Sequence, residues 1–173
     1  KICVVGAGYW GKNHLKTLAK LDALGGVVEI DNYTMHEITS LYHNIGTHQS
    51  IIDALSNNYD GFIIATPANT HCSIAKTIIK AQKPVLIEKP MTLSLKDAKD
   101  LVLLSEKKNI NVLIGHVLLF HPAILKIKNM IKNGDIGDLQ YIYSNRLNLG
   151  KVRTEENVFW SLAPHDIAIF QYL

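Results

Sequence analysis

The sequence has 173 residues, which is enough for one complete domain and the beginning of a second. Hydrophobic residues make up 47% and charged residues 19%, and no apolar run approaches the ~20 residues of a transmembrane helix, so a membrane protein is excluded. The net charge of +3 comes from lysines scattered along helical stretches, which excludes a nucleic-acid-binding surface. Cys3 and Cys72 form no disulfide or metal pattern, so we expect reduced thiols, a cytoplasmic location and no metal site.

The beginning of the chain predicts a dinucleotide-binding turn. A short, β-branched apolar run over residues 1–5 leads without a gap into Gly6-x-Gly8-x-x-Gly11. In such a turn the first glycine permits a tight bend, the second lets the backbone approach a pyrophosphate, and the third lets the next helix pack closely on the strand. The helix N-terminus then favours the phosphates. We expect cofactor contacts from Gly6, Gly8, Tyr9, Trp10 and Gly11.

Strand and helix patterns alternate after this turn, which predicts a parallel α/β sheet of the doubly wound Rossmann type over residues 1–118. Strands are expected at residues 1–5, 27–30, 62–65, 85–87 and 112–115, with a further, poorly marked strand between residues 44 and 50. Helices are expected at residues 12–24, 33–44 and 50–56, from the turn 66–71 to residue 81, and at 94–109 and 122–133.

Two acidic residues mark the end of the second expected strand. Glu29 and Asp31 lie about 20 residues after Gly11, where a dinucleotide fold places the carboxylate that binds the adenosine ribose. Glu29 is the preferred candidate for this carboxylate, and Asp31 is the alternative. A third explanation is that these acids are only solvated carboxylates at the end of a strand. Neither residue is followed by an arginine or lysine that would hold a 2′-phosphate, so we expect NAD rather than NADP.

Polar segments follow two later strands. Thr66-Pro67 and His71 follow one of them, and Glu88-Lys89-Pro90 follows the next. Because ligands of doubly wound sheets bind outside the carboxyl ends of the strands, both segments are expected to face the glycine turn. Lys89 is suited to holding a substrate hydroxyl and stabilising a developing alkoxide, whereas His71 either touches the cofactor or is structural.

The pattern changes after Gly137. Residues 139–147 alternate apolar and polar side chains in the manner of a strand with one solvated face, which is typical of an antiparallel sheet. We therefore expect residues 119–173 to begin a second, incomplete α+β domain with a mainly antiparallel open sheet.

The motifs, in this order, resemble the Gfo/Idh/MocA family of sugar oxidoreductases. They are Gly6-x-Gly8-x-x-Gly11, Ala65-Thr66-Pro67 with His71, Glu88-Lys89-Pro90, Gly115-His116 and Ala163-Pro164-His165-Asp166. Within the family, residues 143–151, 155–157 and 160–167 are most similar to the dehydrogenases of UDP-N-acetylglucosaminuronic acid in surface-polysaccharide synthesis. Family members are considerably longer, with a C-terminal domain that binds substrate and supports dimers or tetramers, so we expect a homodimer or homotetramer when the chain is full length.

The resemblance implies NAD-dependent oxidation of a sugar hydroxyl with Lys89 and His165 as the catalytic pair. His165 would take the hydroxyl proton, a role for which histidine is suited near neutral pH. Lys89 would orient the hydroxyl and stabilise the negative charge that develops on it. Lys89 would also contact the nicotinamide ribose, and Glu88 is expected to contact the cofactor as well. Asp166 would cap or support the helix that carries His165, and the peptide bond between Lys89 and Pro90 would be cis.

The only two arginines, Arg146 and Arg153, flank a segment that leads toward His165, with Asn145 and Asn148 nearby. Because the planar guanidinium fits carboxylate or phosphate, we expect these four residues to bind an anionic substrate. With the resemblance, this predicts oxidation at the 3-hydroxyl of a UDP-N-acetylated hexuronic acid. A neutral sugar or inositol is the alternative substrate, and a non-catalytic NAD sensor that binds another protein is a second alternative; the catalytic pair favours the enzyme.

Overall fold

A computed structural model describes residues 1–147 and 157–173 of the chain. The chain divides into two compact units, Lys1–Ile114 and Gly115–Leu173. The predicted domain boundary between residues 118 and 119 falls inside the short 3₁₀ helix η1 (Val117–Phe120), just after the start of the second unit. Among the helices in the described ranges, none combines the length and the hydropathy that a membrane span requires.

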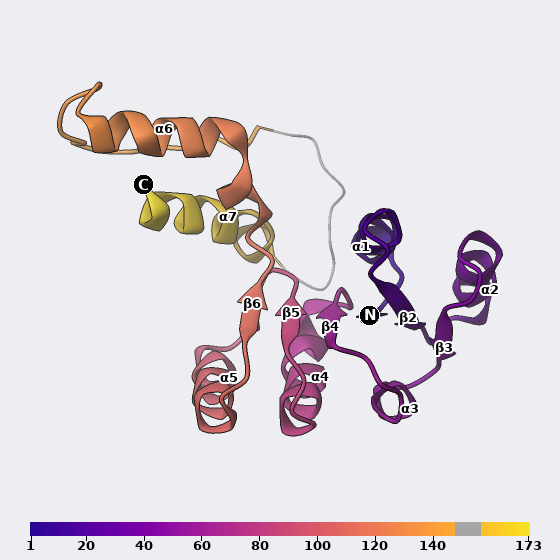
Figure 1. The fold of residues 1–173 in the computed structure, drawn as a ribbon. Helices are drawn as coiled ribbons and strands as arrows, with labels where there is room; N and C mark the ends of the chain where they lie inside the picture. Colours follow the sequence, from indigo (N-terminus) through magenta and orange to yellow (C-terminus); the bar gives the residue numbers. More distant parts are fainter. Residues whose placement is uncertain (148–156) are drawn as a thin grey trace. The chain divides into compact units, whose positions relative to one another are not determined.

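The first unit is built on a six-stranded sheet with helices on both faces (Figure 1). The strands follow the order β3-β2-β1-β4-β5-β6, and each neighbouring pair is parallel. The strands are β1 (Ile2–Val5), β2 (Leu24–Val28), β3 (Gly46–His48), β4 (Gly61–Ile64), β5 (Val85–Ile87) and β6 (Val112–Ile114). This is the Rossmann strand order, so the predicted fold class is confirmed for this unit.

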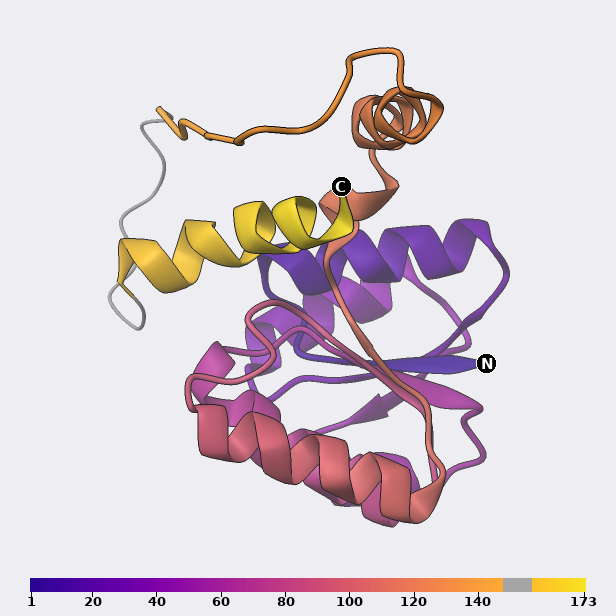
Figure 2. The same ribbon diagram turned by 90° about the vertical axis from the view of Figure 1, so that its left-hand side faces the viewer.

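Two layers of helices bury the two faces of the sheet. One face packs against α1 (Tyr9–Lys20) and α2 (Asn32–Leu41), and the other against α3 (Ile51–Leu55), α4 (Ala68–Lys80) and α5 (Leu95–Lys108), as Figures 1 and 2 show. Within β1, Val4 belongs to the first core, whereas Cys3 and Val5 belong to the second. Because both faces are covered, the strands are apolar at successive positions, which made most of them recognisable in the sequence.

The double glycine Gly25-Gly26 lies inside β2, although the sequence pattern predicts it as the end of a helix. Helix α1 already ends at Lys20, and the chain turns through Asp22, which has a left-handed φ of 51°. The glycines are required because the ring of Tyr59 lies against them: a Cβ on Gly26 would be 2.3 Å from the Tyr59 hydroxyl oxygen. The predicted boundaries of this helix and strand were therefore wrong, because a distant aromatic ring determines where the glycines lie.

The second unit contains η1, α6 (Pro122–Asn133) and α7 (Val158–Tyr172). Lys128 on α6 donates a hydrogen bond to the Tyr172 carbonyl at 2.6 Å and lies 3.3 Å from the centre of the Tyr172 ring. The predicted strand over residues 139–147 is not formed, since this segment has no regular secondary structure. A strand needs a neighbour to pair its backbone groups, and the described part of this unit contains no other strand.

Gly11 is the point of closest approach between α1 and the preceding turn. A Cβ on Gly11 would lie 1.9 Å from the Gly6 carbonyl oxygen. We predict that Gly11→Ala lowers the free energy of unfolding by about 1–3 kcal/mol, the usual cost of overpacking, in urea denaturation. The control is Gly8→Ser, because a Cβ there meets no atom of the described residues within 4 Å and serine suits the N-cap position that Gly8 holds before α1. Equal stability of both variants would contradict the prediction.

Candidate active site

Residues that directly follow neighbouring strands form one continuous edge of the sheet. The parallel hydrogen-bond ladder continues one residue past each strand. The bonds run from Glu29 N to His48 O at 3.0 Å, Gly6 N to Val28 O at 2.8 Å, Ala65 N to Val5 O at 2.8 Å and Glu88 N to Ile64 O at 2.9 Å. Four segments are therefore neighbours along this edge: the strand-end acids, the glycine turn, the Thr66-Pro67 turn and the Glu88-Lys89 turn. They lie around the point between β1 and β4, where doubly wound sheets bind ligands.

The glycine turn leaves room for a ligand at the start of α1. Gly6 has a φ of 89°, and a Cβ on it would lie 2.8 Å from the Thr66 side chain, so the glycine turn and the Thr66-Pro67 turn are in contact. Apart from its chain neighbours and the backbone of its own helix, no atom in the described part of the chain lies within 4 Å of the position of a Cβ on Gly8. Tyr9 and Trp10 follow on the first turn of the helix and are 83% and 39% exposed. An open helix N-terminus of this kind can accept a pyrophosphate.

Glu29 and Asp31 have different surroundings. One carboxylate oxygen of Glu29 accepts a hydrogen bond from Ala7 N in the glycine turn at 2.7 Å. The other accepts from the N–H groups of Ile30 and Asp31 at 2.8 and 3.0 Å. Asp31 instead caps α2 by accepting a hydrogen bond from Thr34 N at 2.7 Å. Hydrogen bonds from the side chain and the backbone of Thr34 lower the pKa of Asp31 from its usual value. Glu29 is therefore bound to the glycine turn and Asp31 to the start of α2, and the choice of Glu29 as the ribose ligand stays a prediction.

The carboxylate of Glu88 is bound on both sides by the protein. Its Oε1 lies 2.7 Å from Nε2 of His14 on α1, and its Oε2 accepts a hydrogen bond from the backbone N–H of Lys89 at 3.2 Å. The side chains of His14 and Glu88 are 22% and 14% exposed. His14 was not predicted from the sequence, although it follows Gly11 by one helical turn on the same face of α1. The peptide bond between Lys89 and Pro90 is cis, as predicted.

His71 lies beneath two of these turns and is 1% exposed. Its Nε2 is 2.8 Å from the Thr66 carbonyl oxygen, and its Nδ1 is 2.9 Å from the Pro90 carbonyl oxygen. Both ring nitrogens thus contact backbone of the protein. This arrangement corresponds to the structural alternative for His71 and not to a direct cofactor contact.

The second unit carries His165 on α7. Asn157 caps this helix through a hydrogen bond from Trp160 N at 3.0 Å, so Asp166 is not the cap. Asp166 instead accepts two hydrogen bonds from the Arg146 guanidinium, from Nε at 2.7 Å and from Nη2 at 3.1 Å. The bonds from Arg146 lower the pKa of Asp166 from its usual value. Asp166 therefore supports α7 beside His165 by joining it to the preceding segment.

The predicted substrate residues are only partly described. Arg146 is paired with Asp166, and its side chain is 30% exposed. Asn145 is exposed. Asn148 and Arg153 lie outside the described residues.

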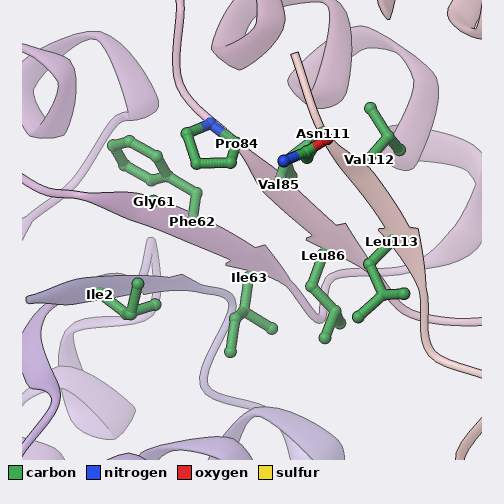
Figure 3. A pocket seen from close by; sticks show the side chains of 10 residues that line it. All are labelled: Ile2, Gly61, Phe62, Ile63, Pro84, Val85, Leu86, Asn111, Val112 and Leu113. Atoms are coloured by element: carbon green, nitrogen blue, oxygen red, sulfur yellow. The ribbon is translucent and has the colours of Figure 1, made fainter.

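A hollow of about 490 Å³ lies at the opposite end of the strands (Figure 3). On the face of the sheet next to the hollow lie the side chains of Ile2, Ile63, Leu86 and Leu113. The starts of β4, β5 and β6 also line it. Its ten lining residues include no acid, base or nucleophile. The chemistry that the sequence predicts therefore belongs to the carboxyl edge and not to this hollow.

Comparisons with known proteins agree with the fold and with the cofactor. Residues 1–116 match the family described as "oxidoreductase family, NAD-binding Rossmann fold". The chain is 28% identical to UDP-N-acetylglucosamine 3-dehydrogenase of Acidithiobacillus ferrooxidans over 95% of this chain and 51% of that protein. A crystal structure of that dehydrogenase has a TM-score of 0.69 and covers 74% of this chain and 42% of its own.

Two further relatives are named for another pathway or another substrate. GenD2 from gentamicin A biosynthesis, solved in complex with NAD, is 25% identical, with a TM-score of 0.72 over 78% of this chain and 39% of that one. Inositol 2-dehydrogenase 1 of Saccharopolyspora erythraea is 26% identical over 100% of this chain and 54% of that protein. The chain spans about half the length of the curated relatives that it matches.

We predict that Glu29→Gln weakens NAD binding roughly tenfold or more in a calorimetric titration, because a charge-assisted hydrogen bond contributes about 1.5–3 kcal/mol. Asp31→Asn is the matched control, since asparagine is an equally good helix cap and Asp31 is already occupied in capping α2. Weaker binding only in Asp31→Asn would assign the ribose to Asp31 instead. Tighter binding of NADP than of NAD would contradict the cofactor assignment.

Proposed function

Since the chain belongs to the Gfo/Idh/MocA oxidoreductase family, with its NAD-binding Rossmann fold, we propose that the full-length protein oxidises the 3-hydroxyl of a UDP-N-acetylated sugar with NAD as the oxidant. One observation carries this proposal: Glu29, the glycine turn, the Thr66-Pro67 turn and the Glu88-Lys89 turn follow one another along one edge of the sheet. That arrangement gives a dinucleotide site and a lysine beside it. NAD, when bound, supplies the acceptor for the hydride of the hydroxyl-bearing carbon.

Lys89 and His165 act on the reacting hydroxyl group. Lys89 follows β5 at the edge of the site, where its ammonium group holds the reacting hydroxyl and stabilises the negative charge that develops on its oxygen. His165, on α7, takes the hydroxyl proton as general base. The pair of hydrogen bonds between Arg146 and Asp166 fixes the helix at the residue next to His165.

The substrate class rests on the relatives and on the environment of Arg146. A relative that matches 95% of the chain is a UDP-N-acetylglucosamine dehydrogenase by name, and the position oxidised in it is the 3-hydroxyl. The expectation of a uronic acid depended on arginines that would read its carboxylate. Because the guanidinium of Arg146 is taken up by Asp166, we place an uncharged UDP-N-acetylated sugar before the uronate, and inositol after both.

We predict that His165→Asn lowers kcat by roughly 10²–10⁴-fold, the usual contribution of a general base, while NAD still binds. Lys89→Met is expected to lower kcat by about 10²–10³-fold through the loss of charge stabilisation. The measurement is NADH formation by the full-length protein, and Lys96→Met on the exposed face of α5 is the control for the loss of a lysine.

Turnover close to that of the unmodified protein in either variant would remove that residue from the mechanism. If the unmodified protein oxidises no sugar but binds a protein partner only with NAD present, the non-catalytic sensor is the correct reading.

Arg146→Lys separates the two UDP-sugar substrates. If Arg146 serves Asp166, we predict that this variant lowers kcat/KM by a similar factor for UDP-N-acetylglucosamine and for the corresponding uronate. If Arg146 binds the uronate carboxylate, only the uronate loses activity, by roughly tenfold or more, because a hydrogen bond between charged groups contributes about 1.5–3 kcal/mol. A selective loss would therefore restore the uronic acid as the preferred substrate.

A further inference from the structure

The residues on either side of Lys89 are each held by a histidine from a different helix. Glu88, before it, contacts His14 on α1, and Pro90, after it, contacts His71 on α4. The two helices cover opposite faces of the sheet. Lys89 is therefore fastened to both layers of the first unit at a place where the strand has ended and the ladder no longer constrains the backbone.

The contact before Lys89 is a pair of largely buried, polar side chains. His14 Nε2 and Glu88 Oε1 are 2.7 Å apart, and the second oxygen of Glu88 accepts a hydrogen bond from Lys89 N. The carboxylate thus links the imidazole directly to the backbone of the lysine. Because α1 also begins at the glycine turn, the helix that we propose holds the cofactor phosphates also carries the histidine that contacts this carboxylate.

The contact after Lys89 is buried more deeply. His71 is 1% exposed, and its ring lies between the carbonyl oxygens of Pro90 and Thr66 at 2.9 and 2.8 Å. A carbonyl oxygen only accepts hydrogen bonds, so the N–H of a neutral ring donates to one of these two turns while its other nitrogen faces the second. Thr66 packs against Gly6, which places the glycine turn, Thr66, His71 and Pro90 in one chain of contacts.

We propose that His14 and His71 are positioning residues for Lys89. Neither is a catalytic residue; His14 acts through Glu88, and His71 acts through the Pro90 carbonyl. With the backbone held on both sides, the direction of the bond from Cα to Cβ of Lys89 is fixed. A displacement of about 1 Å at a reacting group can cost roughly 10²-fold in rate, so this support has a measurable effect. The inference rests on the proposed function, because it assigns Lys89 a role in turnover.

A double-mutant cycle in the full-length protein tests the positioning role. His14→Leu is expected to lower kcat tenfold or more, up to roughly 10²-fold, with a much smaller change in the KM for NAD. In a Lys89→Met background the same change should have little further effect, because the group that it positions is gone. His14→Gln, which can still donate to Glu88, should recover part of the loss.

The outcomes separate the two hypotheses. If Lys89→Met is impaired and the effect of His14→Leu multiplies with it, the positioning role is wrong while the proposed function stands. If Lys89→Met has normal turnover, the proposed function fails, and the positioning role fails with it.

A second measurement does not depend on activity. The rate at which a limiting amount of an acylating reagent modifies Lys89 is compared by peptide mass spectrometry with that of the exposed Lys96 in the same sample. We expect His14→Leu and His71→Gln to change this ratio several-fold, and His43→Gln, at an exposed histidine, to leave it unchanged. Should His71→Gln fail to fold, His14→Leu decides the result. An unchanged ratio in His14→Leu would overturn the inference.

Discussion

The register of the parallel sheet is the constraint on which the site depends. Val5 pairs with Val28 on one side and with Ile64 on the other, and Ile64 pairs with Ile87. Because the strands end in register, the residues that follow them emerge at the same height, and polar groups from distant parts of the chain become neighbours. A slip of one residue would turn every side chain of a strand to the opposite face, which two buried faces forbid. The two cores therefore determine which polar residues lie at this edge.

Much of the first unit could be predicted from the sequence because its signals are local. The limits of β5 and α6 agree with the expected ranges, since an apolar run and a helical stripe with proline at the start and glycine at the end need no distant information. The glycines of β2 were wrongly predicted to end a helix. They are required because the ring of Tyr59, from a later part of the chain, leaves no room for a Cβ at these positions. The expected strand over residues 139–147 failed because alternation shows only that a segment can pair, not that it has a partner.

The site was predictable in composition but not in its pairings. The sequence indicated which polar residues follow the strands, and the structure places several of them at one edge. The sequence could not show that four of these residues have hydrogen-bond partners within the protein, namely Asp31, His71, Glu88 and Arg146. A polar residue at a turn can bind a ligand or a group of the protein, and the sequence pattern does not distinguish the two. His14 was missed for the same reason: a polar residue on a helix ordinarily faces solvent, and its partner lies 74 residues away along the chain.

The cap that Asp31 provides for α2 limits how cofactor preference can change in evolution. Acceptance of a 2′-phosphate requires a cation near the ribose in place of a carboxylate. An arginine at position 31 would remove the cap and cost about 0.5–2 kcal/mol, whereas a serine or asparagine would keep the cap but add no charge. The side chain of Ile30 does not cap a helix and is 82% exposed. A change of preference is therefore expected to go through positions 29 and 30, since an arginine at position 31 would carry the cost of the lost cap.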